Sequence, residues 1–150
     1  MSSALQPPAR YAAAVGTHLG FSDWLTVDQH RIDTFADATG DHQWIHVDPE
    51  RAAAGPFGTT IAHGFLTLSL VPHLLRDLVD YPAWPVRINY GSDRVRFLSP
   101  VPVGSRVRAS AELVAVRPSG TGSQVTVSVT VEIEGSDKPA LVAQTLTLLA

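Results

Sequence analysis

Residues 61 to 78 read Ile-Ala-His-Gly-Phe-Leu-Thr-Leu-Ser-Leu-Val-Pro-His-Leu-Leu-Arg-Asp-Leu, and the run is apolar on nearly every side until Arg76 and Asp77. A helix without a polar face must be surrounded by protein or by lipid. His63 and Pro72 interrupt the run, and a bilayer crossing needs roughly 20 apolar residues in succession. The sequence therefore predicts a central helix over Ile61–Leu78, enclosed by a β-sheet.

Length and composition narrow the class of protein. The chain has 150 residues, the size of one ordinary domain, and we expect a single domain over residues 1–150 with a poorly ordered lead-in over residues 1–14. The absence of cysteine excludes thiol catalysis and cysteine-bound zinc. A net charge of −3 without a Lys/Arg run indicates neither nucleic acid nor a membrane as a partner. These features predict a cytoplasmic protein that acts on a small molecule.

A helix is expected before the central one, over Gln29–Ala38. Its apolar residues recur at helical spacing, and either Thr26 or Asp28 can cap its first turn. Gly40 is a suitable C-terminal stop. Asp41 then lies in a loop just past a helix end, where rigid scaffolds commonly present reactive groups.

After residue 80 the helical spacing of apolar residues is replaced by an alternation of apolar and polar residues. Strands are predicted over residues 86–97, 107–115, 125–133 and 140–149, as an antiparallel meander, with a β-bulge at Gly91-Ser92. A curved sheet needs an apolar element on its concave face, and the Ile61–Leu78 helix is long enough. The expected fold is therefore α+β, a single hot-dog fold in which a curved antiparallel sheet wraps a central helix. Its exposed edges favour pairing with a second copy.

The chemistry is expected around Asp41 and His46. A carboxylate and an imidazole separated by four residues in a tight loop can both reach one water, and histidine titrates near neutrality. Such a pair can remove a proton from water and return one to a neighbouring carbon. The alternative, which spacing alone favours, is that Asp41 caps a turn and His46 is a buried histidine with one hydrogen bond. No metal is expected, because zinc needs at least three convergent ligands.

Three segments together resemble a known family. They are Gly40-Asp-His-Gln-Trp-Ile-His46 followed after five residues by Ala52, then Gly55-Pro-Phe-Gly58, and Ile61-Ala-His-Gly-Phe65. With residues 89–97, they resemble the MaoC-like dehydratase family, and most of all its branch of proteins similar to nodulation protein N. The resemblance runs from about Val15 to the C-terminus. It implies a hot-dog fold, a homodimer, and (R)-specific enoyl-CoA hydratase activity in fatty acid metabolism.

The resemblance also implies roles for single residues. The family's catalytic aspartate falls on Asp41 and its histidine on His46, where they would activate a water that adds to the β-carbon of a trans-2-enoyl thioester. Backbone N–H groups near His63 and Gly64 would meet the thioester oxygen. Gly64 can also serve close packing of the helix against the sheet.

One departure from the family pattern concerns Gln43-Trp44, which stands where the hydratase signature has Asn-Pro. Gln43 could orient His46 or the water. Trp44 is far larger than proline, and it either narrows the acyl tunnel or, as we expect, fills core or a subunit contact. Coenzyme A enters as part of the substrate and no other cofactor is expected. Arg94 and Arg96 are candidates for its phosphates, and the alternative for both is a solvated strand face.

Two other functions fit the same residues. An acyl-CoA thioesterase on this fold would use Asp41 to activate water against the carbonyl carbon. A non-catalytic acyl-thioester-binding protein would carry Asp41 and His46 without poising them for chemistry. The presence of both groups at the family spacing favours hydration over either alternative.

Overall fold

The computed structural model describes residues 8–79 and 84–150. A six-stranded antiparallel sheet dominates it, in the order β1-β4-β5-β6-β3, with β2 also paired to β4. The strands are β1 (His18–Phe21), β2 (Leu25–Val27), β3 (Arg87–Phe97), β4 (Ser105–Ser119), β5 (Gly122–Ile133) and β6 (Leu141–Leu149).

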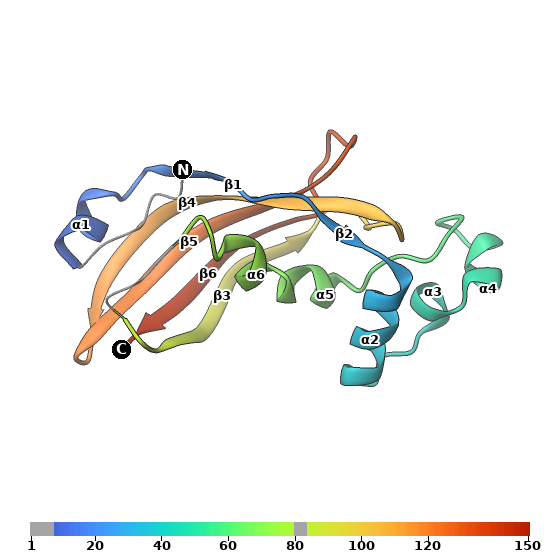
Figure 1. Ribbon diagram of the computed structural model, residues 1–150, viewed down its shortest axis with the longest axis horizontal. Helices are drawn as coiled ribbons and strands as arrows, with labels where there is room; N and C mark the ends of the chain where they lie inside the picture. Colours follow the sequence, from blue (N-terminus) through green and yellow to red (C-terminus); the bar gives the residue numbers. More distant parts are fainter. Residues whose placement is uncertain (1–7, 80–83) are drawn as a thin grey trace.

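The helices lie along the sheet and beyond its ends. They are α1 (Pro8–Ala13), α2 (Gln29–Thr39), α3 (Trp44–Val47), α4 (Pro49–Ala53), α5 (Gly64–Ser69) and α6 (Val71–Leu75). Figure 1 shows α5 and α6 along the hollow side of the curved sheet, and α2, α3 and α4 gathered beyond one end of it. This is the hot-dog arrangement that the sequence predicts. Among the described helices, none is long and apolar enough to cross a membrane.

The predicted central helix differs in one respect. Instead of one helix over Ile61–Leu78, there are two short ones, and α5 begins only at Gly64. Pro72 explains the break, because proline has no N–H to donate and its ring clashes with the carbonyl four residues earlier in a continuous helix. Ile61 instead forms an isolated β-bridge to Pro102. Burial is as expected, and the buried residues of this segment include Leu66, Leu70, Val71, Leu74, Leu75 and Leu78.

The strand order also corrects the prediction of a meander. The four long strands form where expected, but β3 pairs with β6 and takes the far edge of the sheet. Alternation along a strand determines which side chains face the core, and it carries no information on which neighbour a strand pairs with when the connection is not a tight hairpin. The predicted bulge is confirmed, because the β3–β6 register shifts between Asn89 and Gly91.

Alternate residues of β5 form part of the hydrophobic core, as the sequence predicts. Val125, Val127, Val129 and Val131 are buried, while the residues between them are half-buried. At the other end of the chain, residues 8–13 of the expected lead-in form α1, and Tyr11 is completely buried. An aromatic ring that joins the core stabilises a short segment that composition alone marks as weakly structured. Residues 1–7 lie outside the described part of the chain.

Candidate functional site

The α2 helix and its caps place Asp41. The N–H of Arg31 donates to the Asp28 side chain at 2.9 Å, so Asp28 rather than Thr26 is the N-cap. Gly40 ends the helix in the left-handed region, with φ of 80°, and its N–H donates to the Ala36 carbonyl at 2.8 Å. Glycine reaches this conformation without a steric penalty. The chain therefore turns sharply at Gly40, and the next residue, Asp41, is exposed.

His46 lies on α3, a one-turn helix where a loop was expected, and it is buried. Its Nδ1 lies 2.6 Å from the carbonyl oxygen of Ile61. A carbonyl only accepts, so Nδ1 carries the hydrogen, and the neutral ring keeps its acceptor lone pair on Nε2. The main chain before α5 thus selects the tautomer of His46 and leaves Nε2 as the atom available for a proton.

Two residues that sequence reasoning missed hold α3 in place. Gln29 donates from Nε2 to the His46 carbonyl at 2.7 Å, and the Thr60 hydroxyl donates to Gln29 Oε1 at 2.6 Å. Thr60 is almost fully buried. In the sequence, Gln29 is simply a polar residue at the start of a helix, which is common on solvent-exposed helices. The hydrogen bonds that join positions 29, 46 and 60 could therefore not be predicted.

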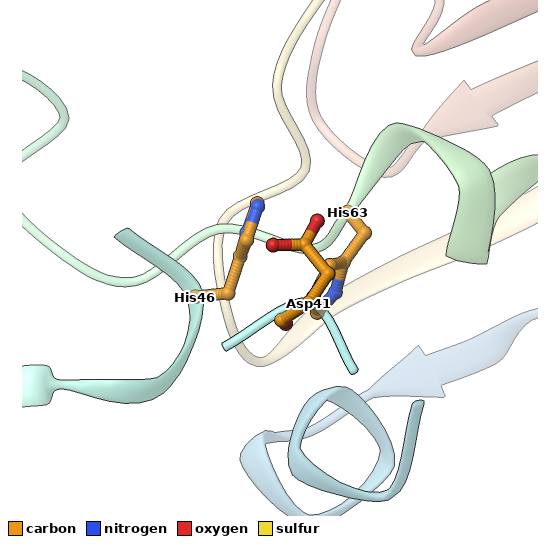
Figure 2. Close-up of side chains that lie close together, drawn as sticks. All are labelled: Asp41, His46 and His63. Atoms are coloured by element: carbon orange, nitrogen blue, oxygen red, sulfur yellow. The ribbon is translucent and has the colours of Figure 1, made fainter. Parts of the chain in front are cut away.

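His63 joins the pair. A carboxylate oxygen of Asp41 and ring nitrogens of His46 and His63 lie within 4.8 Å of one another, and Figure 2 shows the Asp41 carboxylate directed toward the two imidazoles. The imidazoles stack, with ring centroids 3.8 Å apart and planes 22° apart. Nitrogen lone pairs lie in the ring plane, and two nearly parallel planes do not converge on one cation. The stack therefore does not favour a metal centre, and the absence of a metal stays a prediction.

Burial lowers the pKa of His46. The hydrogen bond to the Ile61 carbonyl and the charge of Asp41 oppose this shift, whereas His63 adds to it. Burial disfavours the charged imidazolium because it removes water from around it. His46 is thus neutral at neutral pH, in the form that accepts a proton.

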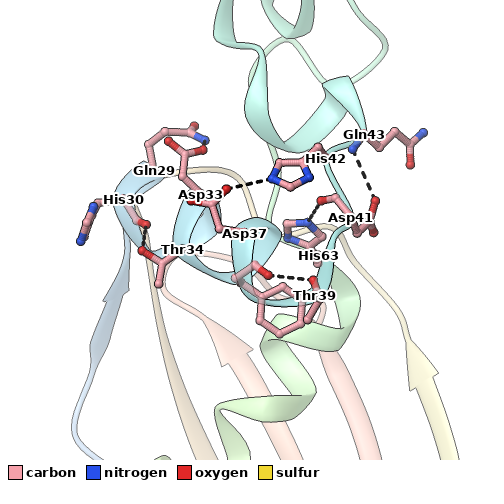
Figure 3. A network of polar contacts seen from close by, with 11 residues as sticks. Gln29, His30, Asp33, Thr34, Asp37, Thr39, Asp41, His42, Gln43 and His63 are labelled. Atoms are coloured by element: carbon pink, nitrogen blue, oxygen red, sulfur yellow. Dashed lines mark hydrogen bonds and ion pairs between the residues drawn. The ribbon is translucent and has the colours of Figure 1, made fainter.

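The two residues after Asp41 turn away from the pair. His42 is exposed, and its ring lies 2.8 Å from an Asp37 carboxylate oxygen, which raises its pKa. Gln43 contacts Asp41 through its main-chain N–H at 3.4 Å (Figure 3). Among the described residues, the Gln43 side chain has no hydrogen-bond partner. Neither an orienting role for that side chain nor a site role for His42 is supported by these contacts.

A cavity of about 300 Å³ opens beside His46. Gly64 lies in its wall, and a Cβ at that position would stand 3.1 Å from the Phe97 ring, so a larger residue there would require the ring to shift by a few tenths of an ångström. The Gly64 N–H belongs to the first residue of α5 and precedes the first intrahelical hydrogen bond. The lining residues are His46, Phe57, Ile61, Ala62, Gly64, Thr67, Phe97, Ser99, Pro100, Val101 and Ala140.

A second cavity, of about 460 Å³, lies further along α5 and β3. Thr67 lines the first cavity and Leu68 the second, so the two follow each other along the helix. Apolar residues of α5 and α6 form one wall, and hydroxyl groups of β6 and β3 form part of the other, among them Thr145, Thr147 and Ser92. The first cavity reaches His46 and the second lies between α5, α6 and the sheet, and they share no lining residue.

Three predicted residues lie elsewhere. Trp44 packs against Gly55, and the Arg51 guanidinium lies 4.4 Å from its ring centre, so Trp44 fills local structure and lines neither cavity. Arg94 and Arg96 are exposed on β3 and also line neither cavity. Arg96 donates to the Val95 carbonyl at 2.7 Å.

Known proteins are similar to this chain in sequence and in architecture. The family model described as MaoC like domain matches residues 10–134. A 3-hydroxyacyl-thioester dehydratase Z of Mycobacterium tuberculosis is 60% identical over 139 residues, which cover 92% of each chain. Nodulation protein N of Rhizobium leguminosarum bv. viciae is 52% identical over 90% of this chain and 86% of its own.

A solved structure agrees with this. The (R)-hydratase from A. caviae involved in PHA biosynthesis has a TM-score of 0.74, is 26% identical, and covers 91% of this chain and 96% of its own. The sequence resemblance is thereby confirmed at the level of family, fold and class of enzyme. The chain belongs to the MaoC-like dehydratase family, and it is a hydratase/dehydratase built on the hot-dog fold.

Proposed function

We propose that this chain is an (R)-specific enoyl-CoA hydratase, which adds water across the trans-2 double bond of an acyl-CoA thioester and catalyses the reverse dehydration. The observation that carries the proposal is the approach of the Asp41 carboxylate to within 4.8 Å of the ring nitrogen of His46, which lines a cavity of about 300 Å³. The names of the mycobacterial dehydratase and of the A. caviae (R)-hydratase support the substrate class and the stereochemistry.

In the proposed reaction, Asp41 and His46 hold one water between them. The pair takes a proton from the water as its oxygen bonds to C3, and a proton is returned to C2, so the proton count balances. His46 suits this task because its Nδ1–H is committed to the Ile61 carbonyl and its Nε2 lone pair is available. Positioned acid–base groups of this kind contribute roughly 10²- to 10⁴-fold to a rate.

The thioester oxygen gains negative charge while C2 is an enolate carbon. The N–H of Gly64 is the donor we propose for this oxygen, because it has no intrahelical acceptor and lies in the wall of the cavity that His46 also lines. Donors that are already aligned stabilise such charge without reorganisation. The acyl chain would then extend past Thr67 toward the second cavity.

The experiment is incubation of the purified protein with crotonyl-CoA and with a longer trans-2-enoyl-CoA. We expect the enoyl-thioester absorbance to fall and (R)-3-hydroxyacyl-CoA to form, with no release of free thiol. Thiol release without hydration would replace the proposal with a thioesterase. Binding of acyl-CoA without either product would replace it with a binding role for these substrates, and an (S)-product would contradict the stereochemistry.

We further propose that the chain acts as a homodimer paired at β3. Nearly every residue of this long edge strand is exposed, and large apolar side chains stand on it and beside it, with Tyr90 63% and Phe65 68% exposed. A long edge strand that exposes its main-chain groups is a template for another strand. A second copy supplies an identical, self-complementary edge.

Sedimentation should therefore give a dimer for the native protein and a monomer for the double variant Tyr90→Lys with Phe65→Lys, because two like charges would meet across the two-fold axis. Val15→Lys is the matched control, since Val15 is also an exposed apolar residue and lies beside β1, at the opposite edge of the sheet. A native monomer at micromolar concentration would contradict the dimer.

A further inference from the structure

His63 stands immediately before α5, in the N-cap position, but its side chain does not cap that helix. It points back to the segment that carries Asp41, and its Nε2 lies 2.9 Å from the Asp41 main-chain oxygen (Figure 3). The carbonyl accepts, so Nε2 carries the hydrogen and Nδ1 is an acceptor. Nδ1 is buried and has no hydrogen-bond partner among the described residues. A buried acceptor without a partner costs stability. A histidine at this position therefore suggests a role that offsets the cost.

The ring of His63 is held between two elements. On one side it stacks on His46, with ring centroids 3.8 Å apart. On the other side it contacts the ring of Phe35 of α2, with centroids 4.9 Å apart and ring planes at 56°. The side chain is only 2% exposed and does not line the cavity beside His46. His63 therefore contacts both members of the proposed pair without facing the substrate space.

We propose that His63 is a positioning residue for hydration, which fixes Asp41 through its main chain and His46 through its ring, so that the two groups face one water. The inference rests on the proposed function and assigns His63 a role through its side chain. Without the hydrogen bond, Asp41 would depend on the Gly40 turn and on the 3.4 Å contact from the Gln43 N–H. Without the stack, the His46 ring would lose one of its packing faces.

The pKa of His46 provides a second test of this role, because His63 influences it. Two titratable groups act on His46, and they have opposite effects: His63 lowers its pKa and Asp41 raises it, while burial is the largest cause of the net lowering. Among the described residues, no other titratable group contributes to the shift. The α2 helix contacts His46 through the Gln29 side chain, and α5 contributes Gly64 and Thr67 to the wall of the cavity that His46 lines. Removing the imidazole at position 63 should therefore raise the pKa of His46.

Two substitutions separate the contacts of His63. His63→Phe keeps a ring for stacking and removes the donor to Asp41, whereas His63→Gln keeps a donor and removes the ring. In each we expect kcat to fall between about 10- and 100-fold, the usual cost of an ångström-scale misplacement. KM for the enoyl-CoA should change little, because His63 does not line the cavity. His73→Phe and His73→Gln are the matched controls, since His73 is exposed on α6 and lines neither cavity.

The pH profile of kcat/KM is the second measurement. Because the pKa of His46 is lowered, the native protein keeps neutral His46, and therefore activity, to a pH below the ordinary value of 6.5. In both His63 variants the acid limb should move to higher pH. A structural role alone would lower activity in proportion to the folded fraction and leave the limb where it is. That outcome, or native kcat in both folded variants, would overturn the inference.

Imidazole ¹⁵N spectra keep this test independent of the reaction. We expect the Nδ1–H tautomer for His46 and the Nε2–H tautomer for His63, and a rise of the His46 pKa in both variants. If the native protein hydrates no enoyl-CoA but the spectra show this coupling, the proposed function fails and the contact between the two histidines stands. If His46 titrates identically in all variants, the positioning role is overturned.

Discussion

Replacing His46 with alanine, or Asp41 with asparagine, is expected to lower kcat for enoyl-CoA hydration about 100-fold or more, the size of the loss of a positioned acid–base group. His46→Ala removes the Nε2 acceptor that the Ile61 carbonyl orients. Asp41→Asn keeps the shape of the side chain and removes its charge. If the two residues act on one water as a unit, the double variant should be little worse than either single variant.

Steady-state kinetics with crotonyl-CoA measures the effect, and circular dichroism shows that the variants are folded. The controls replace the same residue types at exposed positions away from the site, with His73→Ala for the histidine and Asp137→Asn for the aspartate. Loss of less than about tenfold in both site variants would remove Asp41 and His46 from the chemistry, because acid–base catalysis contributes more than that. Additive losses in the double variant would instead assign them to separate steps.

Gly122→Ala is expected to destabilise the fold by about 1–3 kcal/mol, as overpacking of a close contact does. Gly122 opens β5 at the hairpin from β4, and a Cβ there would overlap the main-chain carbonyl of Leu149 on β6. The obstacle is backbone, so no side-chain rotation relieves it. The end of β6 must move, and that end also pairs with β3, because Leu149 is opposite Arg87.

Urea unfolding of native protein and variant measures the difference. Gly91→Ala is the control for stability, because its Cβ would meet only the end of the Leu146 side chain at 3.9 Å, an ordinary contact. We expect the control to stay within about 0.5 kcal/mol of the native protein, as substitutions that neither overpack nor strain the backbone do. Equal stability of Gly122→Ala and native protein would show that the β6 end moves at no cost.

Local signals in the sequence were sufficient for most single elements. The caps of α2 at Asp28 and Gly40, the alternation in β5 and the bulge near Gly91 each depend on residues close together in the chain, and each is found where predicted. Pro72 was evident in the sequence as an interruption of the apolar run. One continuous helix was nevertheless predicted because the run extends past Pro72, and the structure has two short helices instead.

Relations between distant residues could not be predicted in the same way. Pairing of β3 with β6 joins strands that β4 and β5 separate in the chain, and the Gln29 to Thr60 contact links positions with no shared pattern. The family motif brought His63 into the candidate site through its main chain. Its stack on His46 is a tertiary contact, and no spacing along the sequence encodes it.

The placement of α2, α3 and α4 beyond one end of the sheet has a consequence for how activity is lost. Asp41 and His46 are carried by this group of helices and their connections, whereas most of the buried valines belong to β4 and β5. Proteins open in parts, and parts with fewer buried apolar groups open at lower free energy. We therefore expect the helical end to open before the sheet on warming, so that loss of enoyl-CoA hydration precedes loss of the β-sheet signal in circular dichroism.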